Sequence, residues 1–140
     1  MPIDKEIIEN HLDQLKDYIA DIENMDFSEE SLVKDRDIQH LLSHRMHIAV
    51  EVCIDIATHI ASALELPGRN SAVDVILLLG KKGILTKEFS EKFQQAPKLR
   101  NLLIHGYDNI DYRMLYKDYK NDLADLKEFA RQIKEYLEKN

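Results

Sequence analysis

Apolar residues recur at steps of three and four along nearly the whole chain, and few residues interrupt them. Only four Gly and three Pro occur in 140 residues, and no alternating pattern typical of a strand is sustained. A period close to 3.6 residues gives a helix one apolar face, which has to be buried against other helices. The sequence therefore predicts an all-α fold, a compact bundle of about five helices with antiparallel neighbours.

Capping residues and glycines set the boundaries of these segments. Asp4 and Asp111 are the predicted N-caps of the first and last helices, and Ser28 can start a short turn. Gly80 and Gly83 are predicted to close the third helix, and Gly106 the segment that ends at His105. The predicted helices cover residues 4–23, 35–66, 72–79, 87–96 and 111–137, and the segment Arg100–His105 is also predicted to be helical. The predicted core stripe of the first helix is Ile8, Leu12, Leu15, Ile19 and Ile22.

Size and composition limit the class of protein. Residues 1–140 are predicted to form one domain, since no linker, repeat or low-complexity tract divides them. We expect no membrane segment, because no apolar run approaches the roughly 20 residues needed to cross a bilayer and no secretory signal begins the chain. A single cysteine, Cys53, excludes an intrachain disulfide and fits the cytoplasm. The net charge of −7 argues against general coating of nucleic acid, and no DNA partner is expected, but a small cleft with local cations remains compatible with it.

The segment from Arg100 to Tyr107 carries the main candidate for chemistry. It places a permanently charged guanidinium, an imidazole that titrates near neutrality and a phenol within eight residues. Arg100 can hold a phosphodiester, and His105 can take the proton of a ribose 2′-hydroxyl or protonate the leaving oxygen. A purely structural interpretation is also open, in which Arg100 is solvated or salt-bridged, His105 faces a helix dipole and Tyr107 is half-buried packing.

The spacing within this segment poses a difficulty for catalysis. Five residues on a helix turn the two side chains about 140° apart. Arg100 and His105 can still converge if His105 lies on a loosened last turn beside Gly106.

The second helix carries a polar stripe on one face. Its members are His40, His44, His47, Glu51 and Asp55. These are metal-ligand types, but a single helix rarely supplies a whole site, and no metal is predicted. A cleft or a subunit contact suits the stripe better, with Glu51 or Asp55 paired to Arg45 or Arg100.

Three tyrosines alternate with basic residues at the start of the last helix. Such a set can bind single-stranded RNA, and it is equally typical of an amphipathic helix. The set consists of Tyr112, Tyr116 and Tyr119 with Arg113, Lys117 and Lys120.

The motif Arg100-Asn101-(three residues)-His105-Gly106-Tyr107 resembles the Arg-x4-His-x-Tyr motif of HEPN domains in the HepT-like toxin family. Residues 36–40, 47–57, 83–85 and 107–111 are similar to the same family, and the likeness spans roughly residues 1–137. The resemblance implies a four- to five-helix bundle that forms a two-fold homodimer, with the motifs of both subunits in one cleft.

The resemblance also implies an activity and a partner. The family's toxins are metal-independent endoribonucleases of type VII HEPN/MNT toxin–antitoxin pairs and need no cofactor. By carry-over, Arg100 stabilises the scissile phosphate, His105 is the general acid/base and Asn101 helps to orient the site. Tyr107 matches the tyrosine that the MntA-like nucleotidyltransferase antitoxin modifies with AMP, and Glu51 and Asp55 support the cleft or the dimer face. The alternative is a non-catalytic HEPN module that docks a nucleotidyltransferase or nucleotide.

Overall fold

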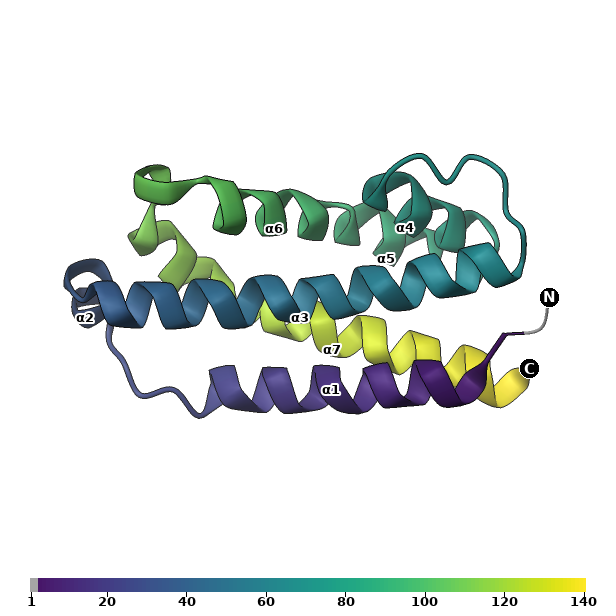
Figure 1. Ribbon diagram of the computed structural model, residues 1–140, viewed down its shortest axis with the longest axis horizontal. Coiled ribbons are helices and arrows are strands. Elements are labelled where there is room, and N and C mark those ends of the chain that lie inside the picture. The colour runs from purple at the N-terminus through teal and green to yellow at the C-terminus, as the bar shows by residue number, and fades with distance from the viewer. Residues whose placement is uncertain (1–2) are drawn as a thin grey trace.

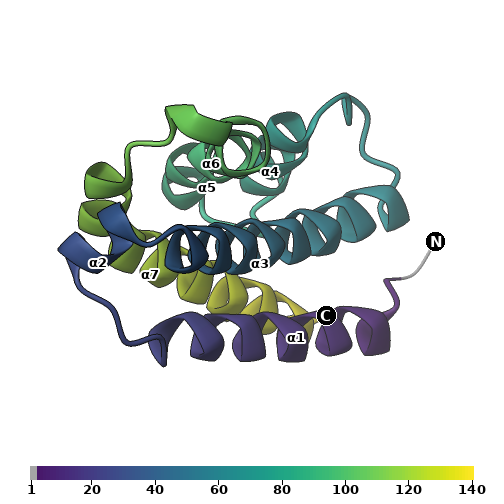
Figure 2. The ribbon, with the colours of Figure 1, turned by 60° about the vertical axis from the view of Figure 1, so that its left-hand side comes forward.

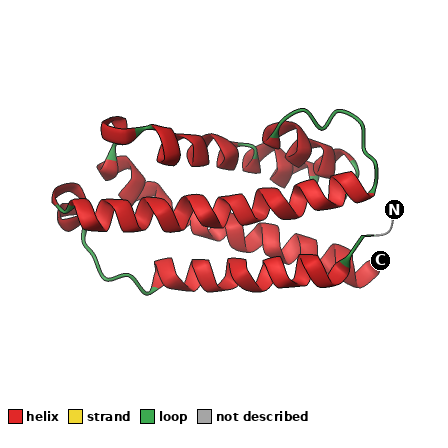
Figure 3. Cartoon of the chain, viewed as in Figure 1, coloured by secondary structure: helices red, strands yellow, loops and turns green. Residues whose placement is uncertain are grey.

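A computed structural model describes residues 3–140, apart from the side chain of Tyr107. Over this range the chain forms seven α-helices, one 3-10 helix and no strand (Figure 3). The prediction of an all-α fold is confirmed. The elements are α1 (Lys5–Glu23), α2 (Glu29–Lys34), α3 (Arg36–Ala63), α4 (Ala72–Lys81), α5 (Lys87–Phe93), α6 (Gln95–His105), the 3-10 helix η1 (Tyr107–Asn109) and α7 (Tyr112–Lys139).

Helix α3 is the centre of the bundle. It contacts α1, α2, α4, α6 and α7, and α1 and α6 lie on opposite sides of it (Figure 1). The short helices α4 and α5 pack together near the start of α6, so these three helices form one irregular layer over α3 (Figure 2). The predicted four- to five-helix bundle is thus built from α1, α3, α7 and this segmented layer.

The apolar stripes predicted from the period of three and four form the core. All five predicted stripe residues of α1 are buried, and α3 and α7 likewise bury apolar residues that recur at steps of three and four. The aromatic rings of Phe93 and Phe129 stack at the centre with centroids 5.1 Å apart, which joins α5 to α7. Burial of this one continuous cluster is the main stabilising term for the fold.

The predicted starts at Asp4, Ser28 and Asp111 are confirmed. The side chain of Asp4 accepts a hydrogen bond from the backbone N–H of Ile7, and that of Asp111 accepts from Arg113 and Met114. Ser28 begins the short helix α2 with a reciprocal capping box. These side chains satisfy amide groups that a helix start otherwise leaves unpaired.

Two glycines do not close helices in the way predicted. Gly80 lies inside α4, where an added Cβ would collide with the side chain of Ser90 on α5, so the glycine permits close helix contact. Gly106 has a right-handed φ of −72°, and an added Cβ there would collide with the carbonyl of Leu102. Both glycines serve close approach rather than a left-handed turn.

Three other boundaries also differ from the prediction. Helix α3 ends at Ala63, before Pro67-Gly68, because Glu65 adopts a left-handed φ of 54°. Helix α5 ends at Phe93, and α6 already begins at Gln95. Helix α4 continues to Lys81, beyond its predicted end at residue 79, and buries one face only.

By length and mean hydropathy alone, α3 is able to cross a membrane, which the sequence reading did not anticipate. Its most apolar window is 56% buried inside the protein, as expected of a core helix.

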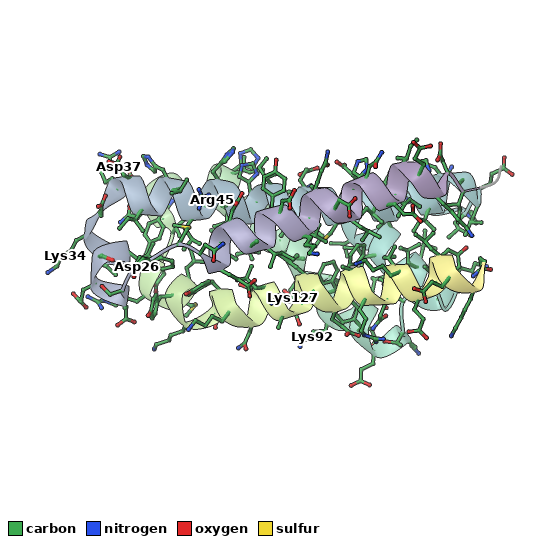
Figure 4. The ribbon with its side chains drawn as sticks, turned by 90° about the horizontal axis from the view of Figure 1, so that it is seen from below. Asp26, Lys34, Asp37, Arg45, Lys92 and Lys127 are labelled. Carbon is green, nitrogen blue, oxygen red and sulfur yellow. The ribbon has the colours of Figure 1, made fainter. Side chains whose placement is uncertain are left out.

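Two polar contacts hold the C-terminal end of α1 against its neighbours. Arg45 of α3 donates to the carbonyl of Asp21 at 2.9 Å, and Lys127 of α7 pairs with Glu23 at 2.7 Å (Figure 4).

Candidate functional site

Helix α6 presents the predicted catalytic residues. Leu103 is buried beneath it, and most of its tertiary contacts are with α3. Arg100 lies in its middle, half-buried against α3, whereas Asn101 and His105 are exposed. Because Asn101 and His105 are four residues apart, they share the outer face of the helix.

Arg100 is held by two protein side chains. Its Nη1 donates to Glu51 Oε2 at 3.1 Å, and its Nε and Nη2 donate to Asn101 Oδ1 at 3.2 and 3.0 Å. The arginine side chain is only 19% exposed, and that of Glu51 is 40% exposed. A guanidinium has five N–H donors, so two remain to bind a phosphate while the others fix the orientation of the group.

The predicted contact between Glu51 and an arginine is therefore confirmed for Arg100. Arg45, the other candidate, bonds instead to the carbonyl of Asp21. Asn101 has a position that the sequence alone did not reveal. It connects the guanidinium of Arg100 to the face of α6 that carries His105.

The last turn of α6 is not loosened. The helix is regular through His105, and the N–H of Gly106 donates to the carbonyl of Leu102 at 2.7 Å. The condition under which His105 could converge on Arg100 within one chain, a loosened last turn, is therefore not met. Within one chain the two side chains leave α6 in different directions, with Asn101 between them.

His47 lies on α3 one turn before Glu51. Its Nδ1 is enclosed and has no hydrogen-bond partner in the described part of the chain, and its ring meets that of His44 edge-on at 5.1 Å. Burial lowers the pKa of His47, and the positive charges of His44 and Arg100 lower it further. Together these effects outweigh the opposing effect of Glu51. The charged form of His47 is therefore disfavoured in the folded protein. The sequence placed His47 in the polar stripe. It did not show that Nδ1 is enclosed, because this depends on how the neighbouring helices pack.

Asp55 is exposed one turn beyond Glu51. Partial burial and the nearby Glu51 carboxylate raise its pKa, against smaller opposite effects of His11 and Arg100. Asp55 therefore extends the acidic side of the site on α3 without touching the guanidinium itself.

The remaining histidines and tyrosines are dispersed or used in packing. Among the described residues, no three His, Cys, Asp or Glu side chains converge to hold a metal ion. Tyr116 and Tyr119 pack against Phe27, with ring centroids 5.9 and 5.4 Å away, and Arg113 pairs with Glu30 at 2.7 Å. Tyr116, Tyr119 and Arg113 are therefore used within the bundle, as the amphipathic interpretation of this part of α7 expects, whereas Tyr112 is half-buried and lines a pocket. The side chain of Tyr107, the predicted modification site, lies outside the described residues.

Comparison with known proteins identifies the family. The sequence model described as "Ribonuclease HepT-like" matches residues 5–133. The chain is 30% identical over 134 residues to the tRNA nuclease HepT of Aphanizomenon flos-aquae, covering 94% of this chain and 86% of that protein. It is 26% identical over 129 residues to the mRNA nuclease HepT of Shewanella oneidensis, covering 92% and 97% of the two chains.

Solved structures support the same family assignment. The tri-AMPylated Shewanella oneidensis HEPN toxin, solved in complex with an MNT antitoxin, superposes with a TM-score of 0.83 at 26% identity, covering 91% of this chain and 96% of that one. The fold and these relatives define a helical-bundle nuclease of the HEPN class. This chain belongs to the ribonuclease HepT-like family, as its motifs predicted.

Proposed function

We propose that this chain is the toxin of a type VII HEPN/MNT toxin–antitoxin pair and acts in the cytoplasm as a metal-independent endoribonuclease. The observation that carries the proposal is the fixed guanidinium of Arg100, held by Glu51 and Asn101 on the same helix as an exposed His105, in a ribonuclease-family scaffold. The relatives named as tRNA and mRNA nucleases support RNA as the substrate class.

The residues can perform the cleavage through the RNA's own 2′-hydroxyl. A neutral His105 takes the 2′-hydroxyl proton, and the resulting oxygen attacks the adjacent phosphorus. The bond from phosphorus to the 5′-oxygen breaks, and an imidazolium gives that oxygen a proton, which leaves a 2′,3′-cyclic phosphate and a free 5′-hydroxyl. Arg100 stabilises the additional negative charge that develops on the phosphate oxygens.

One His105 cannot be both protonated and neutral when the reaction starts. A two-fold homodimer that brings both motifs into one cleft supplies one imidazole of each kind and two Arg100 side chains. The divergence of Arg100 and His105 on a single α6 favours this composite arrangement, because neither copy has to complete the site alone.

Control by AMP transfer fits the same site. A relative was solved as a tri-AMPylated toxin with its MNT antitoxin, and we infer that an MntA-like nucleotidyltransferase attaches AMP to Tyr107. The added phosphate is negative and bulky, so it would repel RNA and obstruct the cleft two residues from His105.

The test is cleavage of RNA by the purified protein. Wild type is incubated with tRNA and with mRNA, with and without EDTA, beside His105→Gln, Arg100→Gln and the control Arg131→Gln, a surface arginine on α7. We expect cleavage that EDTA does not abolish, a loss of at least about 100-fold in both site variants, and an unchanged control. Intact RNA with wild type, together with tight binding to the antitoxin, would support the docking module instead.

A further inference from the structure

A pocket of about 440 Å³ is lined by residues from the start of α3, the end of α6 and the start of α7. These three segments meet at one end of the bundle (Figure 1). This volume falls within the range of ligand sites, roughly 300–1,000 Å³. Its walls combine polar and apolar side chains from these three segments and from η1. The residues used below are Arg36, Ser43, Asp108, Ile110 and Tyr112.

The pocket adjoins the candidate catalytic site. Leu103 and Ile104 of α6 form one wall, and His105 follows Ile104 directly in the chain. The pocket therefore lies at the same end of α6 as His105, although His105 does not line it. A polymer whose phosphate is held at Arg100 can place a neighbouring unit here.

The charged and polar groups of the pocket are largely unused. Arg36 is exposed and forms no ion pair with any residue from 3 to 140. Ser43 is 8% exposed, and its hydroxyl has no hydrogen-bond partner within the same range. An enclosed hydroxyl without a partner is costly, so a polar ligand atom that reaches it is favourable.

The apolar part of the pocket includes the aromatic ring of Tyr112. Tyr112 and Ile110 are half-buried at the pocket. An aromatic ring with an aliphatic neighbour can cover the face of a base. The carboxylate of Asp108 can accept hydrogen bonds from a base amino group or a ribose hydroxyl, and Arg36 can bind a phosphate. A purely apolar ligand would leave these groups unpaired, and a single carboxylate is too few for a metal ion.

We propose that this pocket binds one nucleotide unit, with Arg36 on its phosphate and Tyr112 and Ile110 against its base. The proposal rests on the proposed ribonuclease function for its biological meaning, since the unit would be a nucleotide of the RNA that neighbours the scissile phosphate. The same chemistry can come from a second source, an adenylyl group attached to Tyr107, which immediately precedes Asp108 in the chain. The pocket would in either case select or hold a nucleotide beside His105.

The first test measures binding without catalysis. Each of the four nucleoside 5′-monophosphates is titrated into the purified protein and followed by NMR chemical shifts. We expect saturable binding to wild type, about 10-fold weaker binding to Arg36→Gln, and wild-type binding to the control Lys34→Gln, an exposed cation on α2 outside the pocket. Tyr112→Leu should weaken binding, whereas Tyr112→Phe should keep it, and a circular dichroism melt checks that both variants fold.

The second test measures RNA cleavage. Arg36→Gln should raise KM about 10-fold and leave kcat within about twofold, because Arg36 would contact a neighbouring unit and not the reacting phosphate. Absence of monophosphate binding to wild type, or an unchanged KM in Arg36→Gln, would overturn the pocket proposal. Monophosphate binding that Arg36→Gln removes, in a protein that leaves RNA intact, would keep the pocket and refute the ribonuclease.

A third arm separates the two sources of the nucleotide. Protein that carries AMP on Tyr107 is titrated in the same way. If the attached group occupies the pocket, free monophosphates no longer bind. If their affinity is unchanged, the pocket belongs to the RNA substrate.

Discussion

At the scale of single residues, we expect Glu51 to matter more for the orientation of Arg100 than for the stability of the fold. Its contact with Arg100 is partly exposed, at 40% for the glutamate side chain, and such ion pairs add less than about 1 kcal/mol to stability. Its effect on the direction of the guanidinium is larger, because a misplaced catalytic group can cost up to about 100-fold in rate.

Glu51→Gln should therefore separate activity from stability. We expect kcat/KM for RNA to fall by about 10- to 100-fold while the free energy of unfolding changes by less than about 1 kcal/mol. The measurements are steady-state cleavage and urea unfolding. Unchanged values in both would show that the contact with Arg100 has no role. Glu88→Gln is a suitable control, since Glu88 is an exposed residue on α5.

His47 should make stability depend on pH. Its pKa is lowered in the folded protein, mainly by burial, so the unfolded chain binds its proton more readily. Above the ordinary pKa of about 6.5, His47 is neutral in both the folded and the unfolded protein, and its contribution to stability is fully present. As pH falls below that pKa toward the lower pKa of the folded state, the unfolded chain binds the proton first and stability is lost. His47→Gln should reduce the slope of unfolding free energy against pH in this acid range. An identical slope in wild type and variant would contradict the assignment of a neutral, enclosed imidazole.

At the scale of elements, α7 has a destabilising feature on its surface. Asp118, Asp122 and Asp125 recur at steps of four and three, so their carboxylates share one side of the helix. Asp125 pairs with Lys92 of α5 at 3.0 Å. Burial raises the pKa of Asp122 to about 6, and the carboxylates of Asp118 and Asp125 contribute in the same direction.

Asp122→Asn should consequently stabilise the protein. A raised folded pKa means that the contribution of Asp122 is favourable below its unfolded value of about 4 and is lost as pH rises through about 6. The full shift corresponds to about 3 kcal/mol, but Asp122 is half-exposed and solvent screens it, so we expect a gain of about 1 kcal/mol at pH 7.5. The gain should vanish near pH 4 in chemical unfolding. Asp118→Asn, at an exposed position, should give a smaller gain, and an equal gain at both positions would point to net charge alone.

The elements also show how far sequence reasoning extends. The stripe of α1 and the caps Asp4 and Asp111 were predictable, because period and capping are local properties. The contact of Glu51 with Arg100 joins residues 49 positions apart, and it was predicted only as one of several pairings. The role of Gly80 was not predictable, because it depends on Ser90 of a neighbouring helix. The enclosure of His47 and the pocket beside α6 depend likewise on how helices pack.

At the scale of the whole molecule, the proposed site needs a second copy of the chain, and the surface offers a place for one. Ile104 lies one turn after Arg100 on α6, and Leu41 lies one turn before His44 on α3, so both adjoin the faces that carry the site. Their exposed fractions are 37% and 42%, which is high for large apolar side chains. Burial of such a surface in a dimer would contribute favourably and would bring two α6 helices together.

Leu41→Glu should thus dissociate the homodimer and abolish RNA cleavage without touching Arg100 or His105. A carboxylate buried in an apolar interface is strongly unfavourable, whereas in the monomer this position is exposed and the substitution should be tolerated. The measurement is sedimentation velocity together with cleavage over the same concentration range. The matched control is Met114→Glu, since Met114 of α7 is 60% exposed and belongs to a different helix, and it should remain dimeric and active. A monomeric Leu41→Glu protein with full activity would refute the composite cleft, because it would show that one Arg100 and one His105 are sufficient.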